Sequence, residues 1–221
     1  MAMTAIKDYI LHEHLQPGDP LPTETDLCEQ LGMSRSSVRE AVRTLVALDI
    51  VEVRHGHGTF VGQVSMRPMV ESLVFRGLLR PGDDYSSLLE VVQVRVALDT
   101  AVANDLVAVW NDSSDEQLED LVTQMEHLAA AGRTFTEQDH LFHSMLLAPL
   151  PNQLFAHLTD AFWAVHNLTV PLLGAPAPDD IVLTANAHRH MLDTARAGDA
   201  DGYRAAVVEH YAPLLRALGD P

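Results

Sequence analysis

The sequence lacks most of the features from which disulfide scaffolds, zinc ribbons and membrane spans are built. Its 221 residues include one cysteine, Cys28, which excludes an internal disulfide framework and any multi-cysteine zinc site. It has no apolar run of about 18 residues, the length that a membrane span needs. Residues 1–10 contain no basic stretch followed by an apolar segment, as a secretion signal would. These absences predict a cytoplasmic protein without a membrane partner.

Positive charge is also scarce. The chain has 14 Lys and Arg against 31 Asp and Glu, which gives a formal net charge of −17. Residues 1–62 hold 5 basic and 9 acidic residues (−4), and residues 63–221 hold 9 and 22 (−13). Such acidity argues against a polyanion-binding surface spread over the whole molecule. Any contact with nucleic acid must therefore be local.

Residues 1–62 are predicted to form three helices and a hairpin. Apolar residues recur at helical spacing over 5–15, 24–31 and 35–48, with Ser34 as the cap of the third helix, so only three residues separate the second helix from the third. From Ile50 the apolar period changes to two, which predicts strands at 50–53 and 59–61 around a glycine-containing turn at 54–58. This order of elements is typical of a winged helix-turn-helix.

Residues 63–221 show only helical patterning, which predicts a mainly α chain whose C-terminal part is an all-α antiparallel helical bundle. Asp83, Ser114 and Asp199 are predicted helix N-caps. Segments rich in glycine and proline separate the expected helices, which are 67–78, 85–110, 115–131, 135–147, 152–170, 179–197 and 200–218.

The third helix carries arginines every four residues and therefore on one face. A guanidinium fork can bind guanine O6 and N7, while serine hydroxyls at the helix start suit phosphate oxygens. Glycine at the hairpin tip lets the backbone approach a phosphate or the minor groove. The alternative is a solvated basic face whose arginines pair with Glu40 and other acidic neighbours. The candidate DNA-binding residues are Ser34, Arg35, Ser36, Ser37, Arg39, Arg43, His55, Gly56 and His57.

Histidine is abundant, with 12 residues, eight of them after residue 125. Asp139 and His143 are four residues apart on a predicted helix, so their side chains can converge on one ion. His188 and His210 lie 10 and 11 residues from a predicted hairpin turn at 198–199, which puts them at the same height. These four residues predict a centre for a divalent ion of the Zn, Ni or Mn class. The alternative for Asp139 and His143 is an exposed acid–histidine pair.

Four segments of residues 5–62 together resemble the N-terminal domain of GntR-superfamily bacterial regulators. They are Pro17-Gly18, Leu21-Pro22-Thr23-Glu24, Ser34-Arg35-Ser36-Ser37-Val38-Arg39-Glu40-Ala41 and His55-Gly56-His57-Gly58-Thr59-Phe60-Val61. The resemblance implies that Arg35 and Arg39 read operator bases and that His55 and Gly56 form the wing contact. Thr25 occupies a position at which several members of the FadR branch have a basic residue that contacts DNA. The operator sequence of those members is therefore not assigned to this chain.

Residues 85–215 resemble the FCD effector domain of the FadR branch. The resemblance rests on Arg95-Val96-Ala97-Leu98-Asp99, Asp139-His140-Leu141-Phe142-His143 with Asn152, and His188-Arg189 through Gly198-Asp199 to His210. It implies a division into 1–62 (DNA binding), 63–84 (linker and first helix) and 85–221 (effector, metal binding and dimerisation). The VanR-like version with six helices is disfavoured because residues 67–78 supply an additional helix.

The same resemblance implies that Asp139, His143, His188 and His210 hold the metal and that a small organic acid binds there. Arg95 is the candidate carboxylate clamp because guanidinium binds carboxylate through two hydrogen bonds, and its alternative is a buried structural pair with Asp99. The candidate effector-binding residues are Arg95, Asp99 and Asn152. His140, His157, His166 and His190 are interpreted as surface or near-ligand positions, His127 as solvent-facing and Trp163 as core.

We therefore expect a ligand-responsive bacterial transcription regulator, in the usual case a repressor, that binds a near-palindromic double-stranded DNA operator as a homodimer. One alternative is a DNA-binding regulator whose metal is structural or absent. Another is a metal-dependent hydrolase of small carboxylic acids, which an open metal site permits chemically. The sequence has no H-E-x-x-H element and no general base placed by a motif, which disfavours the hydrolase.

Overall fold

The computed structural model describes residues 1–79, 85–175 and 180–219, so the predicted N-cap at Asp83 lies outside the described residues. The chain divides into two compact units, Met1–Met69 and Val70–Pro221. The division falls inside helix α4 (Arg67–Leu78), a few residues after the border expected at residue 62. Within the described ranges, no helix is long and apolar enough to cross a membrane.

The first unit has the predicted winged helix-turn-helix order. Its elements are α1 (Ala2–His12), α2 (Glu24–Leu31), α3 (Arg35–Ala47), β1 (Val51–Arg54) and β2 (Gly58–Val61). The strands pair antiparallel, with Val51 opposite Val61 and Arg54 opposite Gly58. Apolar side chains from all three helices and both strands form one core, which includes Ile6, Leu27 and Leu45. The predicted fold is thereby confirmed for this unit.

The capping residues of α2 and α3 fix where these helices begin. Thr23 Oγ1 accepts a hydrogen bond from the Asp26 backbone N–H (3.3 Å), and the Asp26 carboxylate accepts one from the Thr23 N–H (3.2 Å). Gly32 ends α2 in the left-handed conformation (φ 63°), and Ser34 Oγ then accepts from Ser37 N–H (3.2 Å). The resulting turn is tight and sets the direction of α3.

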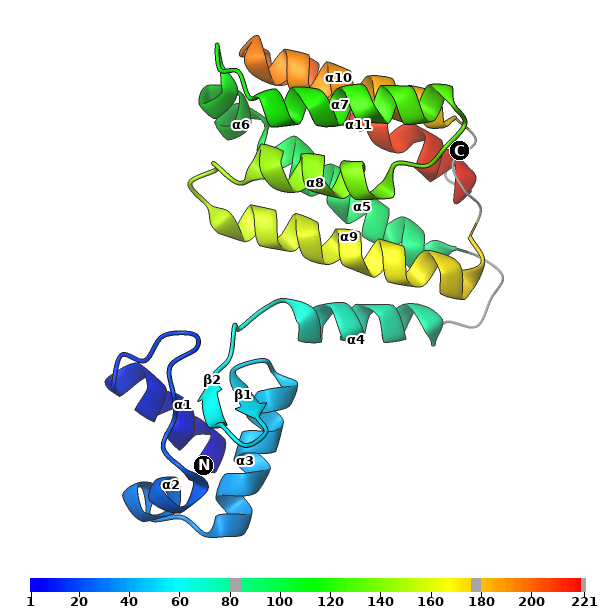
Figure 1. The fold of residues 1–221 in the computed structure, drawn as a ribbon. Coiled ribbons are helices and arrows are strands. Elements are labelled where there is room, and N and C mark those ends of the chain that lie inside the picture. Colours follow the sequence, from blue (N-terminus) through cyan, green and yellow to red (C-terminus); the bar gives the residue numbers. More distant parts are fainter. Residues whose placement is uncertain (80–84, 176–179, 220–221) are drawn as a thin grey trace. The chain divides into compact units, whose positions relative to one another are not determined.

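The second unit is the predicted all-α bundle (Figure 1). Helix α10 packs along α11, α7 packs on both α8 and α10, and α5 contacts α9 and α11. Its core includes Leu88, Met125, Phe142, Met191 and Tyr203. Its helices after α4 are α5 (Ser86–Ala101), α6 (Ala103–Trp110), α7 (Glu116–Ala130), α8 (Thr136–Leu147), α9 (Gln153–Leu173), α10 (Ile181–Arg196) and α11 (Ala200–Ala217).

The single helix expected at 85–110 is wrong, because the chain turns at Val102 between α5 and α6. Ala103 is fully buried where α6 packs on α10 and α11. No glycine or proline marks the turn, so tertiary packing decides it.

Two other helix boundaries in the second unit, the start of α7 and the end of α9, differ from the predicted ones. Asp115, not Ser114, caps α7, and its carboxylate accepts from the N–H groups of Gln117 (2.8 Å) and Leu118 (3.1 Å). Pro171 lies within the last turn of α9, which ends at Gly174 with φ 62°. The predicted cap at Asp199 is confirmed, since its side chain accepts from Gly202 N–H (2.9 Å).

Candidate metal centre, effector cavity and DNA-reading surface

Three helices bring the predicted metal ligands together. Asp139 and His143 come from successive turns of α8, His188 from α10 and His210 from α11. One donor atom from each of the four lies within 4.8 Å of the others. The three histidines are buried, at 3%, 0% and 6% exposure, while the Asp139 side chain keeps 18%. The cluster therefore opens to solvent on the side of its carboxylate.

In this cluster, one nitrogen of each histidine lies near the same oxygen of Asp139. His188 Nδ1–H donates to the Thr184 carbonyl (2.8 Å), which leaves its Nε2 2.8 Å from Asp139 Oδ1. The Nε2 atoms of His143 and His210 lie 3.8 Å and 4.0 Å from the same oxygen. Among the described residues, buried His143 Nε2 and His210 Nδ1 have no hydrogen-bond partner. The unpaired His143 Nε2 beside the Asp139 carboxylate fits a divalent cation, whereas the unpaired His210 Nδ1 is not the nitrogen that approaches this carboxylate.

The surroundings of His143, His210 and Asp139 keep these three ligands in the protonation states that metal binding needs. Burial lowers the pKa of His143 to about 3 and that of His210 well below its usual range, so both imidazoles are neutral. Burial alone would raise the pKa of Asp139, but the His188 hydrogen bond and the neighbouring histidines hold it well below the usual value. Neutral imidazoles with one carboxylate suit Zn, Ni or Mn ions.

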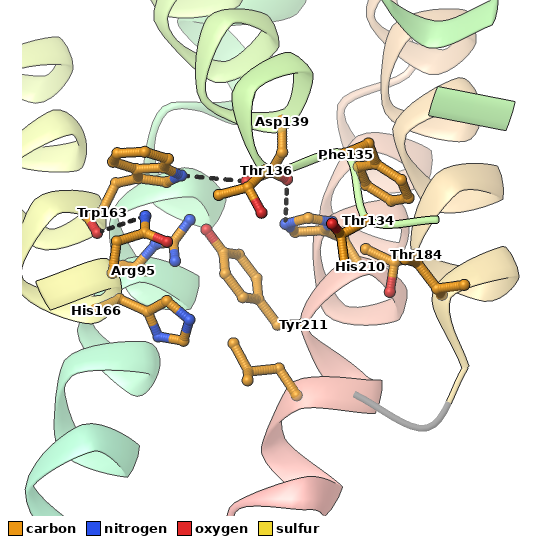
Figure 2. Close-up of a pocket in the computed structure, with 13 residues that line it drawn as sticks. Arg95, Thr134, Phe135, Thr136, Asp139, Trp163, His166, Thr184, His210 and Tyr211 are labelled. Atoms are coloured by element: carbon orange, nitrogen blue, oxygen red, sulfur yellow. Dashed lines mark hydrogen bonds and ion pairs between the residues drawn. The ribbon is translucent and has the colours of Figure 1, made fainter. Parts of the chain in front are cut away.

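A cavity of about 190 Å³ adjoins the cluster (Figure 2). Asp139 and His210 form one part of its wall, and Arg95 from α5 forms another. Arg95 is 3% exposed, and its Nε has no hydrogen-bond partner among the described residues. Burial alone would lower the pKa of Arg95, but Tyr211, Asp139 and Asp99 raise it, so the guanidinium is charged. A metal centre and a buried cation thus border one small cavity.

The other two candidate effector residues lie elsewhere. Asp99 is buried behind the cluster and accepts a hydrogen bond from Tyr211 Oη (2.7 Å) rather than from Arg95. Burial raises its pKa to about 6. Asn152 is exposed and caps α9 by accepting from Leu154 N–H (3.2 Å). Neither lines the cavity, so Arg95 alone of the three is placed to touch a ligand there.

Several cavity residues escaped sequence reasoning. Trp163 was expected in the core but is half-buried at the cavity, where its Nε1–H donates to Asp139 Oδ2 (3.2 Å). His166 lines the cavity on the same face of α9, and burial lowers its pKa to about 4. Trp163, His166 and Asn167 are three and four residues apart, which places them on one face of α9. The sequence alone does not indicate which other helices this face packs against. The remaining lining residues are Thr134, Phe135, Thr136, Asn167, Ile181, Thr184, Tyr211 and Leu214.

In the first unit, α3 presents the predicted basic stripe. Arg35, Arg39 and Arg43 are all exposed. Arg39 makes an exposed ion pair with Glu24 (3.3 Å), and Arg43 makes a longer one with Glu40 (3.9 Å). Exposed pairs of this kind contribute about 0–1 kcal/mol, so a phosphate or a base edge can replace them.

The helix start and the hairpin tip are also accessible. Ser34 Oγ lies 3.0 Å from Ser36 Oγ and 2.8 Å from Ser37 Oγ, and all three serines are exposed. His55, Gly56 and His57 are exposed in the turn, where Gly56 has φ 79°. The left-handed backbone at Gly56 is the conformation that favours glycine.

Family models match both units. Residues 1–61 match the model for bacterial regulatory proteins of the gntR family, and residues 90–213 match the FCD domain. The chain belongs to the GntR family. This GntR-family chain is 43% identical over 109 residues to NedR of Micromonospora viridifaciens, covering 48% of the chain and 78% of the relative. It is 24% identical over 209 residues to the galactonate operon transcriptional repressor of Escherichia coli, covering 95% and 91%.

A solved structure agrees with this assignment. The GntR protein of Streptococcus agalactiae superposes with a TM-score of 0.68 at 28% identity, over 97% of both chains. The GntR-family chain is thus a transcription regulator with an FCD domain. Its family and its named relatives are regulators and not enzymes, so the hydrolase alternative is wrong.

Proposed function

We propose that this regulator binds operator DNA as a homodimer and responds to a small organic acid held between a divalent metal ion and Arg95. The observation that supports this most directly is the shared cavity wall. Asp139 and His210 of the four-donor cluster and the buried, charged Arg95 all border the same space. A bound divalent ion would supply a fixed positive charge there, and Arg95 would add a second.

The cavity favours one anionic group and neutral polar groups beyond it. Arg95 is the one Lys or Arg among the lining residues. The low pKa of His166 keeps its imidazole neutral near pH 7, and the hydroxyls of Thr134 and Thr136 can serve alcohol groups. The volume of about 190 Å³ lies below the ~300–1,000 Å³ common for drug-sized ligands. We therefore favour a small hydroxylated monocarboxylate, and galactonate, named in one relative, is a first test compound.

The DNA half of the proposal assigns α3 to the major groove and the β1–β2 turn to the flanking backbone or minor groove. Arg35 and Arg39 would read bases, and Arg43 and the serines at the start of α3 would hold phosphates. A homodimer presents two such helices to a near-palindromic site. The bound acid would change the spacing or orientation of the two α3 helices. We expect this change to lower the affinity for the operator and so to relieve repression. Couplings of this type are typically ~1–3 kcal/mol.

DNA binding is tested on the intergenic DNA upstream of the protein's own gene. Fluorescence anisotropy at low salt should show specific binding that Arg35→Ala weakens and Arg133→Ala, an exposed arginine of the second unit, leaves unchanged. Analytical ultracentrifugation should give a dimer. Equal binding by wild type and Arg35→Ala would refute the assignment of α3.

Metal and acid are tested on protein purified without a histidine tag. Metal analysis should find bound divalent ion in wild type and little in His143→Ala, with Zn²⁺, Ni²⁺ or Mn²⁺ raising the Tm of wild type only. Galactonate should then raise the Tm further and change operator affinity, and Arg95→Met should abolish both effects. A metal-bound protein whose operator affinity no acid in a carboxylate screen alters would instead hold a structural metal.

A further inference from the structure

The two oxygens of the Asp139 carboxylate face different partners. Oδ1 is the atom that approaches the Nε2 atoms of the three histidines, at 2.8, 3.8 and 4.0 Å. Oδ2 accepts a hydrogen bond from the indole Nε1–H of Trp163 at 3.2 Å (Figure 2). A carboxylate that is hydrogen-bonded on one oxygen has the other free for a metal ion.

The indole is itself held by neighbouring side chains. The His140 ring stacks on Trp163 with 3.8 Å between ring centroids and an interplanar angle of 16°. His140 Nε2 pairs with the Asp160 carboxylate. His140 follows Asp139 on α8, and Asp160 lies one turn before Trp163 on α9. Both helices therefore fix the indole, and an edge of it borders the cavity.

We propose that Trp163 is a positioning residue that makes Asp139 bind the divalent ion through Oδ1 alone. This proposal rests on the metal centre proposed above. It adds that Trp163, by holding Oδ2, keeps one coordination position of the ion open toward the cavity. In binding through both carboxylate oxygens, the ion would compete with the indole N–H for Oδ2, and a weakened hydrogen bond would leave this donor poorly paired. Groups that orient a metal ligand in this way typically contribute a factor of ~10–100 to metal affinity.

The chain provides a matched control for the test. Its two tryptophans are Trp163 and Trp110, and the latter lies in the core at 8% exposure with its Nε1–H donating to the Leu146 carbonyl (2.9 Å). Trp163→Phe and Trp110→Phe both remove one indole N–H and keep an aromatic ring. Only the first removes the bond to Asp139.

The experiment titrates full-length, metal-stripped protein with Zn²⁺ against a chromophoric chelator and with Co²⁺ by visible absorption. Trp163→Phe should bind Zn²⁺ about 10-fold or more weakly. Its Co²⁺ spectrum should also differ from that of wild type, because Asp139 gains freedom to bind through both oxygens. Trp110→Phe should match wild type in Zn²⁺ affinity and Co²⁺ spectrum. In Trp110→Phe, whose one indole is Trp163, Co²⁺ should quench the fluorescence.

The outcomes separate this proposal from the metal centre. Normal Zn²⁺ binding by wild type with unchanged affinity and Co²⁺ spectrum in Trp163→Phe would overturn the positioning role alone. Equal weakening in Trp110→Phe would also overturn it. If Trp163→Phe does not fold, His140→Ala removes the stacking partner instead and must show weaker Zn²⁺ binding and a changed Co²⁺ spectrum. A wild type that binds neither ion would overturn both proposals.

Discussion

At the scale of single residues, the second unit buries ionisable groups that a bundle core normally excludes. Arg95, Asp99 and three histidines are each less than 10% exposed. Burial without full pairing is costly, and Arg95 Nε, Asp99 Oδ1 and His143 Nε2 have no partner among the described residues. Groups retained at such a cost are candidates for ligand binding rather than for stability.

Arg95→Met should therefore leave the ligand-free protein as stable as wild type, or make it more stable. The change removes a buried guanidinium whose Nε has no hydrogen-bond partner among the described residues, and it keeps an unbranched apolar side chain. It therefore removes the free-energy cost of burying an incompletely paired charge. Urea unfolding followed by tryptophan fluorescence would measure it, since both tryptophans lie in the second unit. A loss of stability of about 2 kcal/mol or more would instead show that Arg95 is structural, as a cavity-creating core change would be.

Acidification should destabilise the metal-free protein. Burial lowers the pKa of His143 from 6.5 to about 3 and that of His166 to about 4, so their contribution to stability is present above pH 6.5 and is lost as the pH falls toward those values. Asp99 acts in the opposite sense, because burial raises its pKa from 3.8 to about 6, and its contribution is lost as the pH rises through 6. The buried histidines outnumber it, and each unit of pH below their usual pKa costs about 1.4 kcal/mol per histidine.

The measurement is the free energy of unfolding in chelator from about pH 7 to pH 5, within the window in which both histidines lose their contribution. His166→Asn should flatten the decline, while His127→Asn, at an exposed position, should not. A free energy of unfolding that rises on acidification would mean that Asp99 dominates.

At the scale of elements, local capping decides where the DNA-facing helices begin. Thr23→Ala removes the Oγ1 acceptor of the Asp26 N–H and leaves the other half of the α2 capping box, the bond from the Thr23 N–H to the Asp26 carboxylate. The change should cost about 0.5–2 kcal/mol in the first unit. Thr25→Ala, an exposed position inside the same helix, is the matched control. Thermal unfolding by far-UV circular dichroism should reveal the loss, whereas tryptophan fluorescence, confined to the second unit, should not change. An effect on both signals would mean that the units unfold together.

The elements also show how far sequence reasoning reaches. Asp139 and His143 could be paired from their spacing, and His188 and His210 from equal distances to a hairpin turn, because both relations are local or nearly so. The Val102 turn and the cavity role of Trp163 could not, since they depend on how α6 and α9 pack against helices distant in sequence. Asn152 matched a sequence pattern, but in the structure it caps α9.

At the scale of the whole molecule, the charge of −17 restricts where DNA can bind. Residues 1–62 are themselves at −4, so the arginine stripe of α3 lies among acidic residues, and two of its members already pair with Glu24 and Glu40. Away from the arginine stripe, the acidic side chains repel DNA phosphates. Non-specific DNA is bound through its phosphates alone, so this protein should have a low affinity for it.

We accordingly expect steep salt dependence for the operator and weak binding to random DNA. Each phosphate neutralised adds about 0.9 to the slope of log K against log salt. Arg43→Ala should lower that slope by about 1 and weaken all sequences alike, whereas Arg35→Ala should reduce the preference for operator over random DNA. Anisotropy titrations at several salt concentrations would separate the two effects. A Kd for random DNA equal to that for the operator at ~0.15 M salt would mean that the acidic surface does not restrict binding to α3 and the wing.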